Sequence, residues 1–124
     1  MMATVLIIED NEDNMELISF ILKGEGYDLI QAGTGEDGVD LALEHRPDVI
    51  LLDIQLPGID GYEVLKRIRG TDIGRSIPII AMTSYAMAGD RERLLAAGCN
   101  GYIDKPISPD TVVKQIQATV EGFR

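Results

Sequence analysis

Cysteine, long apolar runs and basic residues are all scarce in this sequence, and each scarcity excludes a class of protein. One cysteine is present, Cys99, so no disulfide can form within the chain, which fits a reducing compartment. The longest apolar runs have about five residues, far below the ~20 that a membrane-spanning helix needs. The N-terminus lacks the basic stretch and long apolar segment of a signal peptide. We therefore expect a cytoplasmic protein.

The shortage of basic residues gives the chain a strong negative charge. Eleven Lys and Arg residues face 21 Asp and Glu residues, so the net charge is −10. Such a field repels nucleic acids and anionic lipids, and direct binding to DNA or to a membrane is not expected. It attracts metal cations and basic partner surfaces. With 124 residues, 45% of them hydrophobic and 26% charged, the chain is predicted to form one globular domain over residues 1–124.

Short apolar runs alternate along the chain with segments of helical periodicity. Five runs rich in Val, Ile and Leu are predicted as strands: Thr4–Ile8, Asp28–Gln31, Asp48–Leu52, Ile77–Met82 and Gly101–Ile103. Five helical stripes are predicted at Leu17, Ile18, Ile21 and Leu22; Val39, Ala42 and Leu43; Val64, Leu65 and Ile68; Leu94 and Leu95; and Val113, Ile116 and Val120. Helix starts are predicted at Asp60 and Ser108, and helix ends at Gly24, Gly70 and Gly98. The alternation predicts an α/β fold: an open, doubly wound, five-stranded parallel sheet with helices on both faces.

Polar side chains gather where the predicted strands end. Glu9 and Asp10 follow the first strand, Asp53 the third and Thr83 the fourth, and Lys105 comes shortly after the fifth. The carboxyl ends of parallel strands share one sheet edge, where open α/β proteins bind their ligands. Two carboxylates 4 Å apart repel by about 4 kcal/mol at an effective dielectric constant of 20, so a cluster of them suits a divalent cation such as Mg²⁺. Lysine and threonine suit phosphoryl oxygens. The set therefore has the parts for phosphoryl transfer onto a carboxylate.

Four segments carry a resemblance to a known family: Val5–Asn11, Asp48–Gly61, Ile80–Thr83 and Asp104–Pro106. Over essentially its whole length the sequence resembles the CheY-like receiver domain of two-component response regulators. Through the stretch Thr83–Asp90 it is most similar to single-domain receivers of the DivK type and to the receivers of hybrid histidine kinases. The resemblance implies a flavodoxin-like fold with strand order 2-1-3-4-5 and a role in phosphorelay signal transduction.

The resemblance also implies a phosphoacceptor and a metal site. Asp53 would accept a phosphoryl group from a phosphohistidine of a sensor histidine kinase or a histidine phosphotransfer protein. Mg²⁺, with Mn²⁺ as a substitute, would be held by Glu9, Asp10, Asp53 and the backbone carbonyl of Gln55. Any phosphorylation or dephosphorylation would act on the chain itself, so no enzyme acting on other molecules is expected.

Further residues are implied to read the phosphoryl group or to set its lifetime. Thr83 and Lys105 would contact the phosphoryl oxygens, and Tyr102 would be the aromatic side chain that turns inward on switching. The peptide bond before Pro106 is usually cis in this family. The variable positions that tune dephosphorylation are occupied by Gln55 and Tyr85.

The resemblance implies two protein-binding surfaces on a monomer or weak dimer. The kinase or phosphotransfer partner would dock on the helix that carries Asn14, Met15 and Ile18. A downstream protein would read the surface formed by Ala88–Ala97, Gly101–Ile103 and Ser108–Val120.

Two other functions compete with this interpretation. The segment Gly33–Gly38 fits the G-x-G-x-x-G pattern, and Asp53 lies about 20 residues further on, as in nucleotide-binding enzymes of the NAD type. Against this, Glu36 and Asp37 would place negative charge where a pyrophosphate needs the helix N-terminus. The second alternative is an aspartyl-phosphate phosphatase, but such enzymes commonly carry a second acid two residues after the nucleophile, where this chain has Gln55.

Single residues also have purely structural interpretations. Lysines such as Lys105 usually lie on the surface, and Tyr102 could be a core residue. His45 is predicted to favour the carboxyl end of a helix, and Cys99 is predicted to be structural. Because the strand-end residues are predicted to lie together at one sheet edge, we favour a functional site over these structural interpretations.

Overall fold

The computed structural model describes residues 3–84 and 88–123. The chain alternates strands and helices in the order β1 (Thr4–Ile8), α1 (Glu12–Gly24), β2 (Asp28–Ala32), α2 (Gly35–His45), β3 (Val49–Asp53), α3 (Gly61–Arg69), the 3₁₀ turn η1 (Gly74–Ser76), β4 (Ile79–Thr83), α4 (Ala88–Ala96), β5 (Gly101–Asp104) and α5 (Pro109–Phe123). All pairings are parallel and the strand order is β2-β1-β3-β4-β5. The predicted α/β fold and strand order are confirmed. Within the described ranges no helix is long and apolar enough to cross a membrane.

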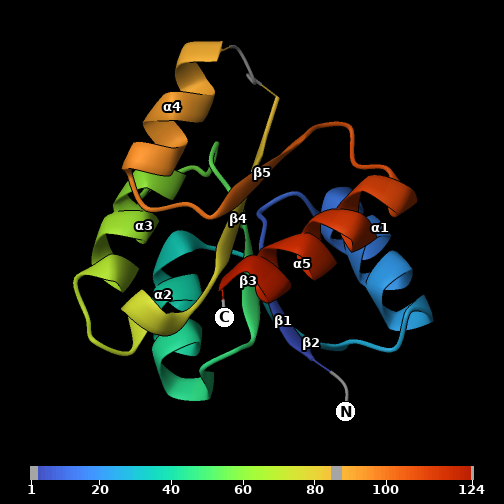
Figure 1. The fold of residues 1–124 in the computed structure, drawn as a ribbon. Helices are drawn as coiled ribbons and strands as arrows, with labels where there is room; N and C mark the ends of the chain where they lie inside the picture. Colours follow the sequence, from blue (N-terminus) through green and yellow to red (C-terminus); the bar gives the residue numbers. More distant parts are fainter. Residues whose placement is uncertain (1–2, 85–87, 124) are drawn as a thin grey trace.

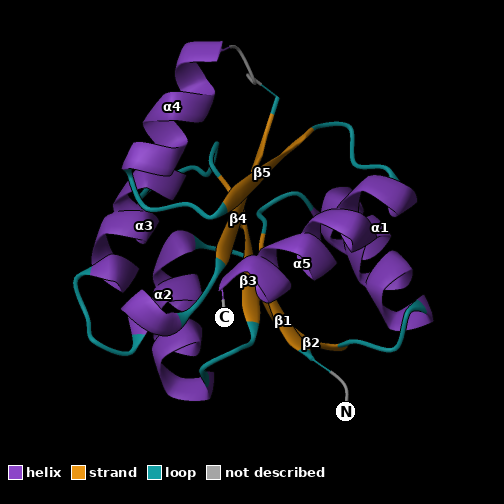
Figure 2. Ribbon diagram, in the orientation of Figure 1, coloured by secondary structure: helices purple, strands orange, loops and turns teal. Residues whose placement is uncertain are grey.

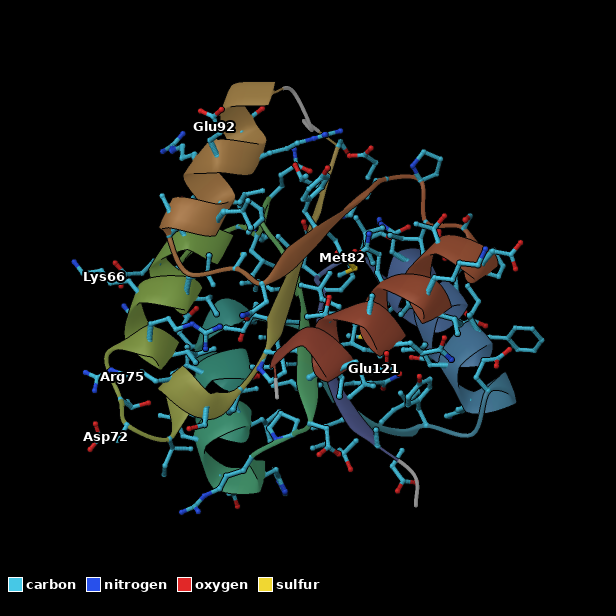
Figure 3. The ribbon with its side chains drawn as sticks, viewed as in Figure 1. Lys66, Asp72, Arg75, Met82, Glu92 and Glu121 are labelled. Carbon is cyan, nitrogen blue, oxygen red and sulfur yellow. The ribbon has the colours of Figure 1, made fainter. Side chains whose placement is uncertain are left out.

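Helices cover both faces of the sheet, with α1 and α5 on one side and α2, α3 and α4 on the other (Figures 1 and 2). The central strands β1, β3 and β4 are buried on both faces. Their successive side chains point to opposite faces of the sheet and pack in the two halves of the core. Leu6 and Leu52 pack toward α2 and α3, whereas Ile7 and Leu51 pack toward α1 and α5. Figure 3 shows Met82 in the interior while Lys66, Glu92 and other charged side chains project outward.

Helix caps follow the sequence signals at two starts. Asp60 caps α3, accepting a hydrogen bond from the N–H of Glu63 at 3.0 Å. Ser108 precedes α5 and accepts from the N–H of Thr111 at 3.3 Å. α1 ends at Gly24, as predicted, and the left-handed residue that follows it is Gly26, with φ 89°.

Several predicted elements need correction. β2 and β5 each end one residue later than predicted, at Ala32 and Asp104. β3 and β4 begin later than predicted and include Asp53 and Thr83, because parallel pairing continues through these residues. Ile77 was predicted to begin β4, but it lies in a loop before the strand, directly after the unpredicted η1. Its side chain is nevertheless buried in the core. Leu17 is 45% exposed and lies outside the buried stripe of α1, which Ile18 and Leu22 form.

Candidate functional site

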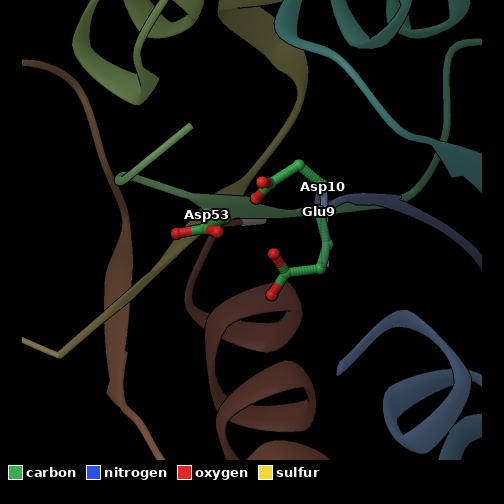
Figure 4. A group of neighbouring side chains, drawn as sticks. All are labelled: Glu9, Asp10 and Asp53. Atoms are coloured by element: carbon green, nitrogen blue, oxygen red, sulfur yellow. The ribbon is translucent and has the colours of Figure 1, made fainter. Parts of the chain in front are cut away.

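Three carboxylates meet at the carboxyl edge of the sheet. Glu9 and Asp10 directly follow β1, and Asp53 is the last residue of the neighbouring strand β3, as Figure 4 shows. One carboxylate oxygen from each lies within 4.8 Å of the other two. Glu9 and Asp53 are buried, whereas Asp10 is exposed. Three hard oxygen donors at this spacing, open to solvent on one side, fit a divalent cation that keeps several waters.

Backbone pairing fixes the position of these acids. The N–H of Glu9 donates to the carbonyl of Ala32 at 3.0 Å, which extends the pairing of β1 and β2 by one residue. Asn11 then caps α1 by accepting from the N–H of Asn14 at 2.9 Å. The N–H of Asn11 also donates to Glu9 Oε2 at 3.3 Å. The turn from strand to helix therefore holds Glu9 toward the site.

Lys105 bridges the two buried acids. Its Nζ lies 3.1 Å from Glu9 Oε1 and 3.1 Å from Asp53 Oδ2. The Lys105 N–H donates to the carbonyl of Thr83 at 2.9 Å, and the Lys105–Pro106 peptide bond is cis. The lysine side chain is 15% exposed, so its charge acts where water screens it little.

Both oxygens of Asp53 have partners from the protein. Oδ1 accepts from the N–H of Gln55 at 2.9 Å, and Oδ2 faces Lys105. These contacts hold the carboxylate in one orientation at the mouth of the site. A buried, oriented carboxylate beside a cation is suited to act as a nucleophile toward phosphorus.

The loops after β3 and β4 are joined by a side chain. Gln55 Oε1 accepts from the N–H of Ser84 at 3.3 Å. Next to this contact lies a cavity of about 150 Å³, whose lining includes Gln55, Tyr62, Thr83, Arg93 and Leu94. Thr83, at the end of β4, is buried. The structure thus brings Thr83 to the edge that carries Asp53.

Three further residues were predicted for the site: Tyr102, Gln55 and Tyr85. Tyr102 lies on β5 in register with Ala81 and is partly buried. Metal binding by the backbone carbonyl of Gln55 stays a prediction, and Tyr85 lies outside the described residues. Sequence reasoning missed the arginines that cover the rings of Tyr102 and Tyr62, because a cation over a ring leaves no motif in the sequence.

The buried charges perturb one another. Burial raises the pKa of Glu9 to about 7, with help from the hydrogen bond and the negative charge of Asp53, although Lys105 acts in the other direction. Burial acts to lower the pKa of Lys105, but its hydrogen bonds and ion pairs with Glu9 and Asp53 outweigh this, and the pKa is raised. When both acids are ionised, the single positive charge of Lys105 does not balance the cluster, which keeps a net negative charge.

The free energy of unfolding of the metal-free protein is expected to fall as the pH rises from about 4.5 to about 7. Glu9 alone should account for a fall on the order of 1–3 kcal/mol. The raised pKa means that the folded state holds this proton more tightly than the unfolded state does, so Glu9 stabilises the fold fully only below its ordinary pKa. Urea titrations in EDTA at pH 5 and pH 8, on wild type and Glu9→Gln, measure the difference. Mg²⁺ should recover most of the loss in wild type. An equal pH dependence in both proteins would contradict this assignment.

Two of the three glycines in the motif after β2, Gly35 and Gly38, have a packing explanation, whereas a Cβ on Gly33 would contact nothing. A Cβ on Gly38 would lie 2.5 Å from Ile8, and one on Gly35 would lie 2.6 Å from Ile59. Thr34 caps α2 by accepting from the N–H of Asp37 at 3.1 Å. The two glycines let α2 approach the sheet and the start of α3, which accounts for them without a nucleotide.

Of the three residues predicted for docking on α1, Asn14 and Met15 are partly exposed and Ile18 is not. Ile18 is fully buried, so its predicted part in docking is wrong. Phe20 is 78% exposed, beside a groove of about 620 Å³ whose lining also includes Glu9, Asp10, Met15 and Gln31. This groove runs from the acidic cluster along α1.

Comparisons with known proteins agree on one family. Residues 5–117 match the family described as the response regulator receiver domain. The chain is 47% identical over 118 residues to the polar-differentiation response regulator DivK of Brucella anthropi, covering 95% of this chain and 96% of that protein. A crystal structure of a response regulator from Chloroflexus aurantiacus superposes with a TM-score of 0.92 at 30% identity, covering 98% of this chain and 99% of the other. The receiver domain of a sensor histidine kinase from Pseudomonas aeruginosa, with a magnesium ion coordinated in its active site cleft, superposes with a TM-score of 0.90 at 36% identity. This match covers 98% of this chain and 99% of the other.

Proposed function

This chain belongs to the response regulator receiver domain family, and from that premise we propose that Asp53 is its phosphoacceptor. The protein is a receiver of two-component signalling, of the DivK type. The observation that carries the proposal is the setting of Asp53: its carboxylate is oriented by Gln55 N–H and Lys105 and lies beside Glu9 and Asp10. We also propose that residues 1–124 form a single cytoplasmic receiver domain.

The proposed reaction moves one phosphoryl group between two proteins. A carboxylate oxygen of Asp53 attacks phosphorus, the bond from phosphorus to the partner's histidine nitrogen breaks, and that nitrogen keeps the electron pair. Mg²⁺, or Mn²⁺ in its place, would bind Glu9, Asp10, Asp53 and the carbonyl of Gln55 and would neutralise charge on the phosphoryl oxygens. The phosphoryl group is gained and lost at Asp53 of this chain, and we propose no reaction on other substrates.

The protein side chains offset the charge that the reaction adds. Phosphorylation replaces the single negative charge of Asp53 by about −1.5 to −2. Lys105, already 3.1 Å from Asp53, can follow the phosphoryl oxygens, and the hydroxyl of Thr83 can donate to one of them. Movement of Thr83 toward the phosphoryl group would bias the neighbouring Tyr102, which gives a two-state switch.

The partners are proposed from the surfaces around the site. A sensor histidine kinase or a phosphotransfer protein would dock along α1, over Asn14, Met15 and the exposed Phe20, because the groove along this helix leads to Glu9 and Asp10, beside Asp53. A downstream protein would read the α4, β5 and α5 surface. The net charge of −10 opposes nucleic acid as a direct partner.

Incubation with acetyl phosphate tests the proposal, and intact mass spectrometry measures the product. Wild type with Mg²⁺ is expected to gain the mass of one phosphoryl group, labile in alkali, and to gain none in EDTA. The physical reason is that an incoming phosphate meets an acidic cluster whose only adjacent cation within the described residues is Lys105. An adduct of equal yield in EDTA would contradict the metal site, and no adduct under either condition would contradict the phosphoacceptor.

A further inference from the structure

Helix α4 has little apolar attachment to the rest of the domain. Among its described side chains, from residue 89 to residue 96, Leu94 alone is buried, and Leu95 is 51% exposed. Figure 1 shows α4 at the margin of the molecule, beside α3 and β5. A helix with so few buried contacts detaches from the domain at a low cost in free energy. Its position therefore depends strongly on each polar contact that it makes with its neighbours.

Two arginines of α4 lie over tyrosine rings of its two neighbours. The Arg91 guanidinium is 4.7 Å from the ring centroid of Tyr102 on β5. The Arg93 guanidinium is 4.5 Å from the ring centroid of Tyr62 on α3. Residues two apart on a helix point in nearly opposite directions, so the two contacts hold α4 from both sides. Both distances are within the range of a favourable cation–π contact.

Both rings stand next to the proposed switch. Tyr62, Arg93 and Leu94 line the small cavity that Thr83 and Gln55 also border. Tyr102 pairs in register with Ala81, two residues before Thr83. A displacement of Thr83 or of Tyr102 therefore reaches α4 directly through these contacts.

We propose that Arg91 and Arg93 are positioning residues that fasten α4 in the unphosphorylated state, and that the Arg91–Tyr102 contact is a latch opposing the switch. The latch rests on the proposed function, because it opens when phosphorylation of Asp53 draws Thr83 and Tyr102 inward. The fastening itself does not depend on phosphorylation. Loss of the latch would favour the switched state, and any ligand that binds that state would bind more tightly.

Two measurements test the proposal on the full chain. Hydrogen–deuterium exchange of α4 amides, without phosphodonor, is expected to quicken about two- to fivefold in Arg91→Gln and in Arg93→Gln, the size of an exposed cation–π contact. Beryllofluoride with Mg²⁺, a phosphoryl analogue, is expected to bind Arg91→Gln about two- to fivefold more tightly than wild type. Glutamine has nearly the helix propensity of arginine, so the helix itself is not weakened.

Matched variants separate the latch from general loosening. Arg91→Lys keeps a cation for the ring and should restore most of the wild-type affinity, and Arg67→Gln, on the exposed side of α3, should change neither measurement. Unchanged or weaker beryllofluoride binding by Arg91→Gln would overturn the latch, and unchanged exchange in both glutamine variants would overturn the fastening. If wild type binds no beryllofluoride, the proposed function and the latch both fail, whereas faster exchange in the variants would still support the fastening.

Discussion

Asp53→Asn is expected to abolish the phosphoryl adduct that acetyl phosphate and Mg²⁺ produce on the wild type. The amide keeps the size of the side chain and an oxygen that can accept from the Gln55 N–H, but it has no anionic oxygen to attack phosphorus. The measurement is intact mass spectrometry of both proteins after the same incubation. The adduct on the variant should fall to the level found without phosphodonor.

The loss should not come from unfolding. Removing the charge of Asp53 relieves its repulsion of Glu9 and leaves Lys105 paired with Glu9 at 3.1 Å, so the variant should fold. Circular dichroism and a urea titration check this. The matched control is Asp104→Asn, the same substitution on an exposed carboxylate that ends the sheet strand β5. Asp104→Asn should be phosphorylated like wild type, and an adduct of undiminished yield on Asp53→Asn would rule out Asp53 as the acceptor.

The fold was predictable from the sequence because local and long-range patterns agree. Runs such as Val5–Ile8 and Val49–Leu52 are apolar at every position, which is typical of parallel strands covered on both faces. Once the sheet is parallel, every strand ends at the same edge, and its polar successors have to meet there. The proximity of Glu9, Asp10 and Asp53 follows from that rule, without knowledge of side-chain geometry.

The remaining features depend on contacts between distant segments. The apolar run ends at Leu52, but β3 continues to Asp53 because Asp53 still pairs with Met82 of β4. This pairing depends on the neighbouring strand and cannot be read from the local sequence. Phe20 and Leu17 are apolar and yet exposed, since they lie outside the buried face of α1, which Ile18, Ser19 and Leu22 form. The link from Gln55 to Ser84 joins side chain and backbone across 29 positions. Hydrophobic periodicity contains none of this information.

Arg69 is the most important residue that the sequence did not reveal, because nothing in the sequence distinguishes it from Arg67, the other arginine of α3. Its guanidinium donates to the carbonyl of Gly98 at 3.0 and 2.9 Å, to the carbonyl of Ile77 at 2.7 Å and to Asn100 Oδ1 at 2.9 Å, and it also contacts the carbonyl of Gly74. Asn100 Oδ1 in turn accepts from the N–H of Ile79 at 2.9 Å. One side chain thus ties α3 to η1, to the start of β4 and to the turn before β5.

Arg69→Met is therefore expected to lower the free energy of unfolding by about 3 kcal/mol, since carbonyls that now accept from a charged donor would be left without it. In a domain of this size the corresponding fall in Tm is roughly 10 °C. Urea and thermal unfolding measure both quantities. The matched control is Arg67→Met on the same helix, whose exposed ion pair with Glu63 should be worth less than about 1 kcal/mol. Equal losses in the two variants would mean that methionine weakens α3 generally, and the role of Arg69 as a tie between loops would have to be abandoned.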